Sequence, residues 1–396
     1  MSSPKRGGLL ADYIAGAVVW YGAMGMQLVI VAWLVMDVLA SRQELGFVRG
    51  AGMAPILILL LLGGLMADRV DRRRLLIGLY LSAAVLTGSL ALIVHAEALD
   101  LWILTVYVIA MGSVTAFLQP ARDALLSDIV DGDMTRPATA ITMTQFGALS
   151  LGTLAAGSAE LLGLSTILGI QAVLLSMGLV ACWRLPSRKP SASQIGLSFS
   201  DAFAGVGEVF GSSSMRSTTL LMVGVGLFFT GAFSVALPLL VYQHHQGDVS
   251  DLSLVMSGLQ AGTVLGAAGM LTLRRIPRRG LTLACSLAGA SLPILALSLG
   301  LPFLGTLVAA FVWGIFVAGF YSMGRAIIQE AAPADHRARV LAVYALSMQG
   351  ATVIGAPMVG LLAAMLGPLG VFVFCAGAML LFVGIICLAT PVLKVD

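Results

Sequence analysis

Three ionisable residues lie inside apolar segments of membrane-spanning length, where a charge is costly and suggests a role. Asp37, Arg49 and Glu160 each fall about one helical turn from the same end of their segments. Because their depths match, they could meet as a protonatable cluster that couples proton entry to opening of the protein. The alternative is that each side chain extends separately to the nearby water interface.

A second concentration of charge occupies a short turn between two apolar segments. The stretch GGLMADRVDRRRLL carries six charges in the seven residues from Asp68 to Arg74, in a chain that is only 10% charged. Arginines alone would orient the chain across a membrane, so the acids Asp68 and Asp71 need a further explanation. A carboxylate at a helix N-terminus gains about 0.3–2 kcal/mol from the exposed N–H groups. A purely topological role therefore leaves these two acids unexplained.

Other chemistries find no support in the residue pattern. The four cysteines lie in or at the end of apolar segments without a CxxC or Cys/His spacing, so we expect neither a metal site nor a disulfide. No lysine stands in a G-K-[ST] setting, which argues against a nucleotide-driven protein. We expect no cofactor and no nucleic-acid partner.

The elements that must position these charges are apolar helices. The chain of 396 residues is 59% apolar with a mean hydropathy of +1.00, whereas a soluble protein needs about a quarter of its residues charged. Lipid must therefore surround most of it, and the apolar runs are too long for membrane strands. We predict an all-α membrane protein with twelve transmembrane helices, over residues 11–38, 46–67, 75–96, 101–120, 138–162, 164–183, 217–242, 252–273, 280–300, 302–324, 338–365 and 368–391.

The basic residues predict how these helices are oriented. All of the 22 lysines and arginines except Arg42 and Arg49 fall on the side of the chain termini. Because basic loops stay in the cytoplasm, we expect a multi-pass protein of the inner (plasma) membrane with both termini cytoplasmic.

The chain divides into two similar halves. Residues 1–183 form a six-helix bundle, 184–216 a cytoplasmic linker, and 217–396 a second six-helix bundle. In the linker, Phe199, Phe203, Val206 and Phe210 share one face of a predicted short amphipathic helix. When the halves are aligned, equivalent residues recur: Arg122 with Arg325, Arg136 with Arg339, and Gly147, Gly152 and Gly157 with Gly350, Gly355 and Gly360. Such a duplication predicts two pseudo-symmetric bundles that rock about a central site.

These features resemble the major facilitator superfamily over essentially the whole chain. The charged turn is similar to the family motif G-x-x-x-D-R-x-G-R-[RK], through Gly64, Asp68, Arg69, Asp71, Arg72 and Arg73, with Asp71 in place of a glycine. PARDALLSDIV at 120–130 resembles a signature of the branch that includes enterobactin exporters. GATVIGAPMVG at 350–360 resembles the antiporter motif, with Gly350, Gly355, Pro357 and Gly360 as helix-packing residues. The copy at 147–157 has Thr153 where that motif carries proline.

The resemblance also implies roles for particular residues. The acid of the turn would dock on the eleventh helix when the protein faces outward, which makes the turn a conformational latch and not only a topological signal. The arginines of the turn can pair with Asp123 or Asp128 of the next loop. Helices 1, 4, 7 and 10 line the cavity in this family, which gives as candidates Trp20, Tyr21, Met24, Gln27, Tyr107, Met111, Phe228, Phe229, Phe233, Trp313 and Tyr321. The midspan glutamines Gln27, Gln145, Gln260 and Gln349 could bind a substrate or tie helices together. An apolar, aromatic cavity suits large amphipathic molecules.

We therefore expect a secondary active exporter of amphipathic small molecules that works by alternating access and proton antiport, and that is a monomer in the bilayer. The first alternative is a dedicated siderophore exporter, and uptake is the next. A membrane enzyme or a regulatory protein without transport is a further alternative, although the chain lacks a nucleophile–base pair. Substrate flux in proteoliposomes would distinguish a transporter from the last two.

Overall fold

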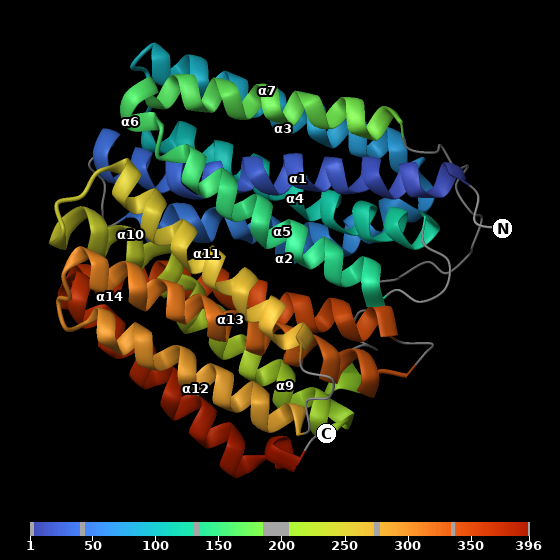
Figure 1. Ribbon diagram of the computed structural model, residues 1–396, viewed down its shortest axis with the longest axis vertical. Helices are drawn as coiled ribbons and strands as arrows, with labels where there is room; N and C mark the ends of the chain where they lie inside the picture. The colour runs from blue at the N-terminus through green and yellow to red at the C-terminus, as the bar shows by residue number, and fades with distance from the viewer. Residues whose placement is uncertain are drawn as a thin grey trace.

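The computed structural model describes residues 4–39, 44–129, 135–184, 206–272, 278–333 and 337–394. Apart from turns and short connections, these residues are helical, and the helices run roughly side by side (Figure 1). Nine of the helices so described are long and apolar enough to cross a membrane. For the described residues, the helical content and the length and apolarity of these helices confirm the prediction of an all-helical membrane protein.

The N-terminal half, residues 4–184, lies in the upper part of Figure 1. Within it α1 packs on α5, α2 on α4, and α3 on α7. Its helices are α1 Pro4–Trp33 with a π-helical end at Leu34–Val38, α2 Leu45–Arg69, α3 Arg72–His95, α4 Leu101–Ile129, α5 Thr135–Ala156, α6 Ala159–Leu162 and α7 Leu164–Trp183.

The C-terminal half, residues 206–394, lies in the lower part of Figure 1. Here α13 packs on both α11 and α12. Its helices are α9 Ser213–Gly224, α10 Leu237–Leu239, α11 Val249–Thr272, α12 Arg279–Leu297, α13 Phe303–Ala331, α14 Arg337–Ala389 and a 3-10 turn at Pro391–Lys394. Three π-helical turns at Val225–Phe229, Ala232–Ala236 and Leu240–His244 continue α9 into one long span.

One predicted helix is interrupted in the structure, and one predicted boundary coincides with a break inside a long helix. The segment predicted as one helix over 138–162 is interrupted at Gly157 and Ser158, after which the short α6 begins. The segments predicted as 338–365 and 368–391 run on as α14, which breaks at Gly367 because this residue has φ 75° and ψ 172°. Only glycine adopts such a conformation readily, so the break coincides with the predicted boundary.

The predicted linker is described only from residue 206 onward. Residues 206–211 are helical, with Val206 and Phe210 exposed, while Val209 is buried against Met215 and Ile328. Phe199 and Phe203 lie outside the described residues. The part that is described therefore packs one apolar residue on the bundle and leaves two others accessible.

The two halves meet along a seam, which we define as the contacts of α2 with α14 and of α5 with α11. Both chain termini lie at one end of the molecule in Figure 1, which we call the terminal end. The opposite end, which holds Val38, Leu45 and His244, is the distal end. These two names carry no statement about the side of the membrane.

Glycines allow the helices to approach closely within each half. A side chain on Gly152 of α5 would overlap the carbonyl oxygen of Gly22 in α1, and one on Gly25 would meet the Thr153 nitrogen at 2.7 Å. Helix association in lipid depends on such small residues because no hydrophobic effect drives it there. The α1–α5 pair is therefore held by backbone proximity.

We predict that Gly152→Ala lowers the thermal stability of the purified protein, because the added methyl group forces α1 and α5 apart at a cost of about 1–3 kcal/mol. Gly147→Ala in the same helix is the control, since a methyl group there meets nothing within 4 Å. The measurement is the midpoint of heat-induced loss of the monodisperse gel-filtration peak. Equal midpoints for the two variants would contradict the close packing.

Candidate functional site

The two halves make a polar contact at the distal end. The Tyr242 hydroxyl donates a hydrogen bond to the Asp37 carboxylate at 3.3 Å, and the Tyr242 ring packs edge-on against Trp33. Beside them lies a cavity of about 490 Å³, lined by Trp33, Asp37, Tyr242, Gln243, Gln246, Gly247 and Asp248. Asp37 thus faces a polar vestibule shared by both halves.

A second polar contact joins the halves through one hydroxyl group. Ser250 Oγ lies 2.8 Å from Glu160 Oε2 and 2.9 Å from Asp248 Oδ1. The hydroxyl has one hydrogen, so it donates to only one of these carboxylates at a time. Two acidic groups from different halves therefore converge on one donor.

Asp248 also caps the N-terminus of α11. The backbone N–H of Asp251 donates to Asp248 Oδ1 at 2.9 Å, and Asp251 Oδ2 accepts from the Asp248 N–H at 3.3 Å, which is a reciprocal capping arrangement. Burial raises the pKa of Asp248, but hydrogen bonds with Asp251, Ser250 and the Glu160 side chain outweigh it and leave the pKa below its ordinary value. Asp248 is therefore ionised at neutral pH.

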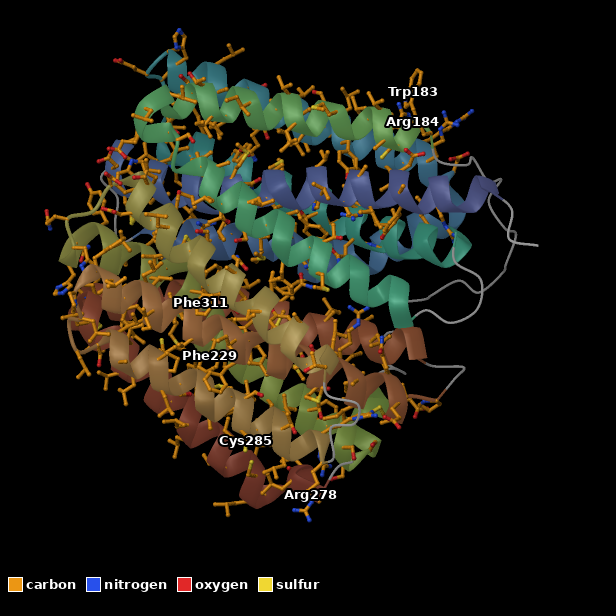
Figure 2. All side chains as sticks on the ribbon, in the orientation of Figure 1. Trp183, Arg184, Phe229, Arg278, Cys285 and Phe311 are labelled. Carbon is orange, nitrogen blue, oxygen red and sulfur yellow. The ribbon has the colours of Figure 1, made fainter. Side chains whose placement is uncertain are left out.

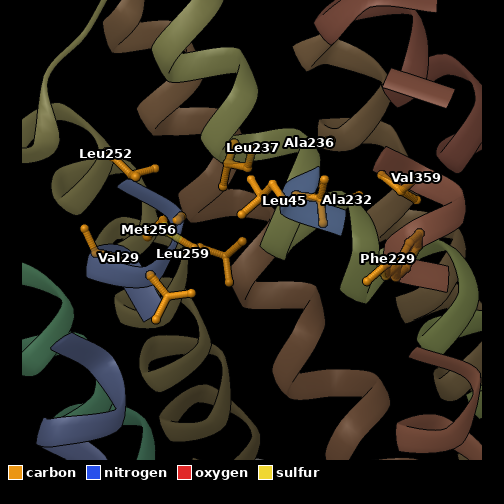
Figure 3. Close-up of a cluster of buried hydrophobic side chains, with 14 of the residues drawn as sticks. Val29, Leu45, Phe229, Ala232, Ala236, Leu237, Leu252, Met256, Leu259 and Val359 are labelled. Carbon is orange, nitrogen blue, oxygen red and sulfur yellow. The ribbon is translucent and has the colours of Figure 1, made fainter. Parts of the chain in front are cut away.

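Apolar and backbone contacts close the distal part of the seam. A side chain on Gly46 of α2 would stand 2.5 Å from the Ala356 carbonyl oxygen, and one on Gly50 would stand 2.8 Å from the Pro357 ring. Figure 3 shows Val29 of α1 beside Met256 and Leu259 of α11. These residues belong to one buried cluster that extends through both halves.

Arg49 does not join Asp37 and Glu160, the two ionisable residues that it could have met at this depth. Its guanidinium donates to the carbonyl oxygen of Leu28 on α1. Among the described side chains, Asp37 bonds to Tyr242 and Glu160 to Ser250, with neither carboxylate in ion-pair distance of Arg49. The structure therefore places two acids at the contact between the halves and the base within the N-terminal half.

The candidate cavity residues fall into two groups. Five pack inside their own halves and are almost inaccessible: Trp20, Tyr107, Met111, Phe229 and Trp313. The others keep partial exposure: Tyr21, Met24, Gln27, Phe228, Phe233 and Tyr321. Phe228 faces Phe374 and Phe382 of its own half.

Two of the partly exposed candidates, Tyr321 and Tyr21, contact an aromatic ring or a charged group inside the protein. Tyr321 meets Phe146 of α5 edge-on at 6.3 Å, which is a contact between the halves. Tyr21 lies under the guanidinium of Arg122 at 4.9 Å, and Tyr13 lies 5.5 Å from the same group. Arg122 is 6% exposed, so the aromatic faces stabilise a buried positive charge.

The helix-packing motif of α14 lies against several partners. A side chain on Gly350 would stand 2.8 Å from Leu57 of α2, and one on Gly355 would stand 2.5 Å from the Leu227 carbonyl oxygen. Pro357 contacts Gly50, and Gly360 contacts Gly46. This stretch therefore forms one side of the seam.

The charged turn is only partly described. Asp71 caps α3 by accepting a hydrogen bond from the Arg74 N–H at 3.1 Å, and Arg72 and Arg73 are half-buried. The side chains of Gly64, Asp68, Arg69, Asp123 and Asp128 lie outside the described residues. At the same terminal end, Figure 2 shows Trp183 and Arg184, and Arg184 forms an ion pair with Asp12 at 3.6 Å.

Sequence reasoning missed several residues at the site. Tyr242, Asp248, Ser250 and Phe146 contact the opposite half, and Gln171 ties α7 to α1 by donating to the Ala23 carbonyl oxygen at 3.0 Å. The position of Ser250 two residues after Asp248, at a predicted helix start, was the available signal for a cap. Nothing in the sequence pairs it with Glu160, ninety residues earlier.

We predict that cysteines at positions 157 and 253 form a disulfide across the distal seam. A side chain on Gly157 would place its Cβ 3.1 Å from the Ser253 Cβ, near the range of about 3.5–4.5 Å that disulfides require. The background lacks all four native cysteines, and maleimide-polyethylene glycol is added after denaturation because Ser253 is buried in the folded protein. Mild oxidation before denaturation should block modification of Gly157→Cys/Ser253→Cys. The control pair Gly147→Cys/Ser253→Cys should stay fully modified. Modification of both pairs would show that the distal seam is not closed.

Comparisons with known proteins identify the chain. The profile of the family described as "Transmembrane secretion effector", a branch of the major facilitator superfamily, matches residues 12–396. The multidrug efflux pump Tap of Mycolicibacterium fortuitum is 26% identical, with 100% of this chain and 98% of that protein covered. The staphyloferrin A transporter of Staphylococcus aureus is 28% identical over 113 residues, which are 28% of this chain and 27% of that protein.

Solved structures share the fold. The nucleoside transporter NupG superimposes with a TM-score of 0.76 at 13% identity, covering 96% of this chain and 98% of that one. A POT family transporter in complex with 5-aminolevulinic acid gives a TM-score of 0.71 at 15% identity, covering 98% and 96%. The chain therefore belongs to the transmembrane secretion effector family of the major facilitator superfamily, and it is a membrane transporter and not an enzyme.

Proposed function

We propose that this transporter exports amphipathic small molecules by alternating access, with two six-helix bundles rocking against each other in exchange for protons. The observation that carries the proposal is the distal contact between the halves, where polar and apolar residues of α1, α2 and α5 meet α11, α14 and the end of the α9 span. Such contacts must form in one state and separate in the other. Residues 1–183 and 217–396 are the two bundles, and 184–216 connects them.

The interior favours an amphipathic substrate. The partly exposed candidates Tyr21, Met24, Phe233 and Tyr321 are aromatic or apolar, and cation–π contact with two tyrosine rings stabilises the buried Arg122. Pockets of this composition bind large molecules with a few polar groups. The similarity to a protein named as a multidrug efflux pump supports export.

Proton coupling is supported by the shared hydroxyl of Ser250. Glu160 and Asp248 converge on it from opposite halves, so two acids compete for one hydrogen-bond donor. We assign the coupling proton to Glu160, which then donates a hydrogen bond at this contact. Asp251 and Asp37 are the other acids nearby, on α11 and at the end of α1. Protonation therefore stabilises the closed distal end, and loss of the proton favours its opening.

The orientation and the latch complete the proposal. Both termini and the linker lie in the cytoplasm of a monomer in the plasma membrane, as the distribution of basic residues implies. The charged turn is a latch whose acid Asp68 docks on the N-terminus of a helix of the other bundle. The family's G-x-x-x-D-R pattern supports this assignment.

A dedicated siderophore exporter is the second candidate. It is favoured by the similarity to a protein named as a staphyloferrin A transporter and by the PARDALLSDIV stretch. That match covers little more than a quarter of the chain, so the broader substrate class is preferred.

We predict that Glu160→Gln or Asp37→Asn abolishes accumulation driven by an imposed pH gradient in inside-out vesicles while leaving downhill exchange intact. Each variant removes a titrating group from the contact between the halves but keeps its size and hydrogen-bonding capacity. The fluorescent probe is the neutral methylamide of dansyl-aminoundecanoic acid, corrected for protein-free liposomes. Asp100→Asn is the control, because this distal acid caps α4 through the Ile103 N–H at 2.7 Å. If the Glu160/Asp37 double variant still accumulates the probe, coupling lies elsewhere.

We predict that Asp68→Asn reduces the transport rate by at least about tenfold without loss of folding, since loss of about 1.4 kcal/mol from one conformational state changes its population by that factor. Asp100→Asn is the control, because this acid caps α4 through the Ile103 N–H outside the charged turn and asparagine also caps helices well. Rates are compared at equal amounts of protein in proteoliposomes. A normal rate for the Asp68 variant would refute the latch.

A further inference from the structure

Arg49 is a half-buried cation whose described partners do not balance its charge. Its hydrogen bond goes to the Leu28 carbonyl oxygen, and its Nε atom is buried without a hydrogen-bond partner. Among the described side chains, no carboxylate lies within ion-pair distance of it. A charge without a counter-ion inside a membrane protein is expensive, and such charges mark substrate or ion pathways.

The position of the guanidinium excludes simple extension to the water interface. Leu28 lies ten residues before Val38, the distal end of the helical span, and therefore about 15 Å from it along the axis. A long side chain that seeks water extends toward the helix end. Arg49 instead binds a backbone carbonyl well inside the span, and part of its side chain remains accessible.

A second unsatisfied group belongs to the residue before Leu28. Gln27 precedes Leu28 in α1, and within the described part of the chain its buried Oε1 atom has no hydrogen-bond partner. A charged N–H donor of the residue that contacts Leu28 and an amide acceptor of the neighbouring residue are thus both unused. Buried polar atoms of this kind are uncommon, and each costs about 1–3 kcal/mol unless something satisfies it.

We propose that Arg49 and Gln27 bind the carboxylate end of the transported molecule. A carboxylate oxygen accepts from Arg49 Nε–H and supplies the missing negative charge, and the amide oxygen of Gln27 accepts from a hydroxyl or N–H beside the carboxylate. The apolar remainder of the ligand lies along the interior. This assignment rests on the proposed export of amphipathic molecules and narrows it to those that carry a carboxylate.

The test compares two probes with different end groups, dansyl-aminoundecanoic acid and its methylamide. Binding to the full-length protein in phosphatidylcholine nanodiscs is followed by dansyl fluorescence. The wild type should bind the acid at least about tenfold more tightly than the amide, as expected for a charge-assisted contact. Arg49→Gln should remove this difference while leaving amide binding unchanged, and Arg49→Lys should keep part of it. Gln27→Leu should weaken binding of the amide, which has an N–H beside its carbonyl group, and should leave acid binding unchanged, because the acid has no donor there.

The control variant is Gln329→Leu, which changes an exposed glutamine near the end of α13 and should leave both affinities unchanged. Equal binding of acid and amide by the wild type, or an unchanged difference in Arg49→Gln, would overturn the assignment. Competition by added phosphatidylglycerol would also overturn it, because the site would then hold a lipid. If Arg49→Gln elutes as aggregate, Arg49→Lys decides the outcome, and an undiminished difference between acid and amide in that variant would overturn the assignment.

Flux measurements separate this inference from the proposed function. If the wild type moves neither probe in proteoliposomes, export of amphipathic molecules is refuted. If it moves both and Arg49→Gln also moves both at wild-type rates, the function stands and the carboxylate site is refuted. Selective loss of acid flux in Arg49→Gln supports both.

Discussion

In a chain surrounded mainly by lipid, every polar group inside the span must find its partner within the protein, because no water is available to replace a missing hydrogen bond. Helices satisfy their own backbones, and the remaining polar atoms are few enough to follow individually. Most have local solutions: serine and threonine hydroxyls donate to carbonyl oxygens one turn earlier, as Thr105 does to Leu101 at 2.7 Å. The atoms that lack such a solution therefore indicate where function lies.

The same constraint explains how the halves are joined. Apolar surfaces gain nothing from leaving lipid for one another, so association depends on shape and close approach. The seam uses Gly46 and Gly50 against the Ala356–Pro357 stretch for this purpose, and few polar bonds cross it. An interface built from backbone proximity separates without leaving many unsatisfied groups, which suits a contact that must open and close. The polar contacts at Asp37 and Glu160 lie at its distal end, where water can solvate them after separation.

The two kinds of charged residue consequently have different roles. Asp37 and Glu160 are exposed and each bonds to a residue of the other half. Arg49 bonds only to a backbone carbonyl of its own half and retains an unsatisfied donor. This arrangement underlies our proposals that the acids respond to separation of the halves and that the base binds an anionic ligand.

The sequence by itself determined the helical membrane class, the family and most helix boundaries, because length, apolarity and motif spacing are local properties that lipid enforces. It also placed Asp37, Arg49 and Glu160 near one end of their helices. Only the tertiary structure decided their partners. Each helix is rotated about its axis in a way that depends on glycine contacts such as Gly152 with Gly22. This rotation directs Glu160 to Ser250 and Asp37 to Tyr242. It also turns Arg49 toward Leu28. Depth in a membrane follows from position along the chain, whereas the direction in which a side chain points follows from how the helices pack.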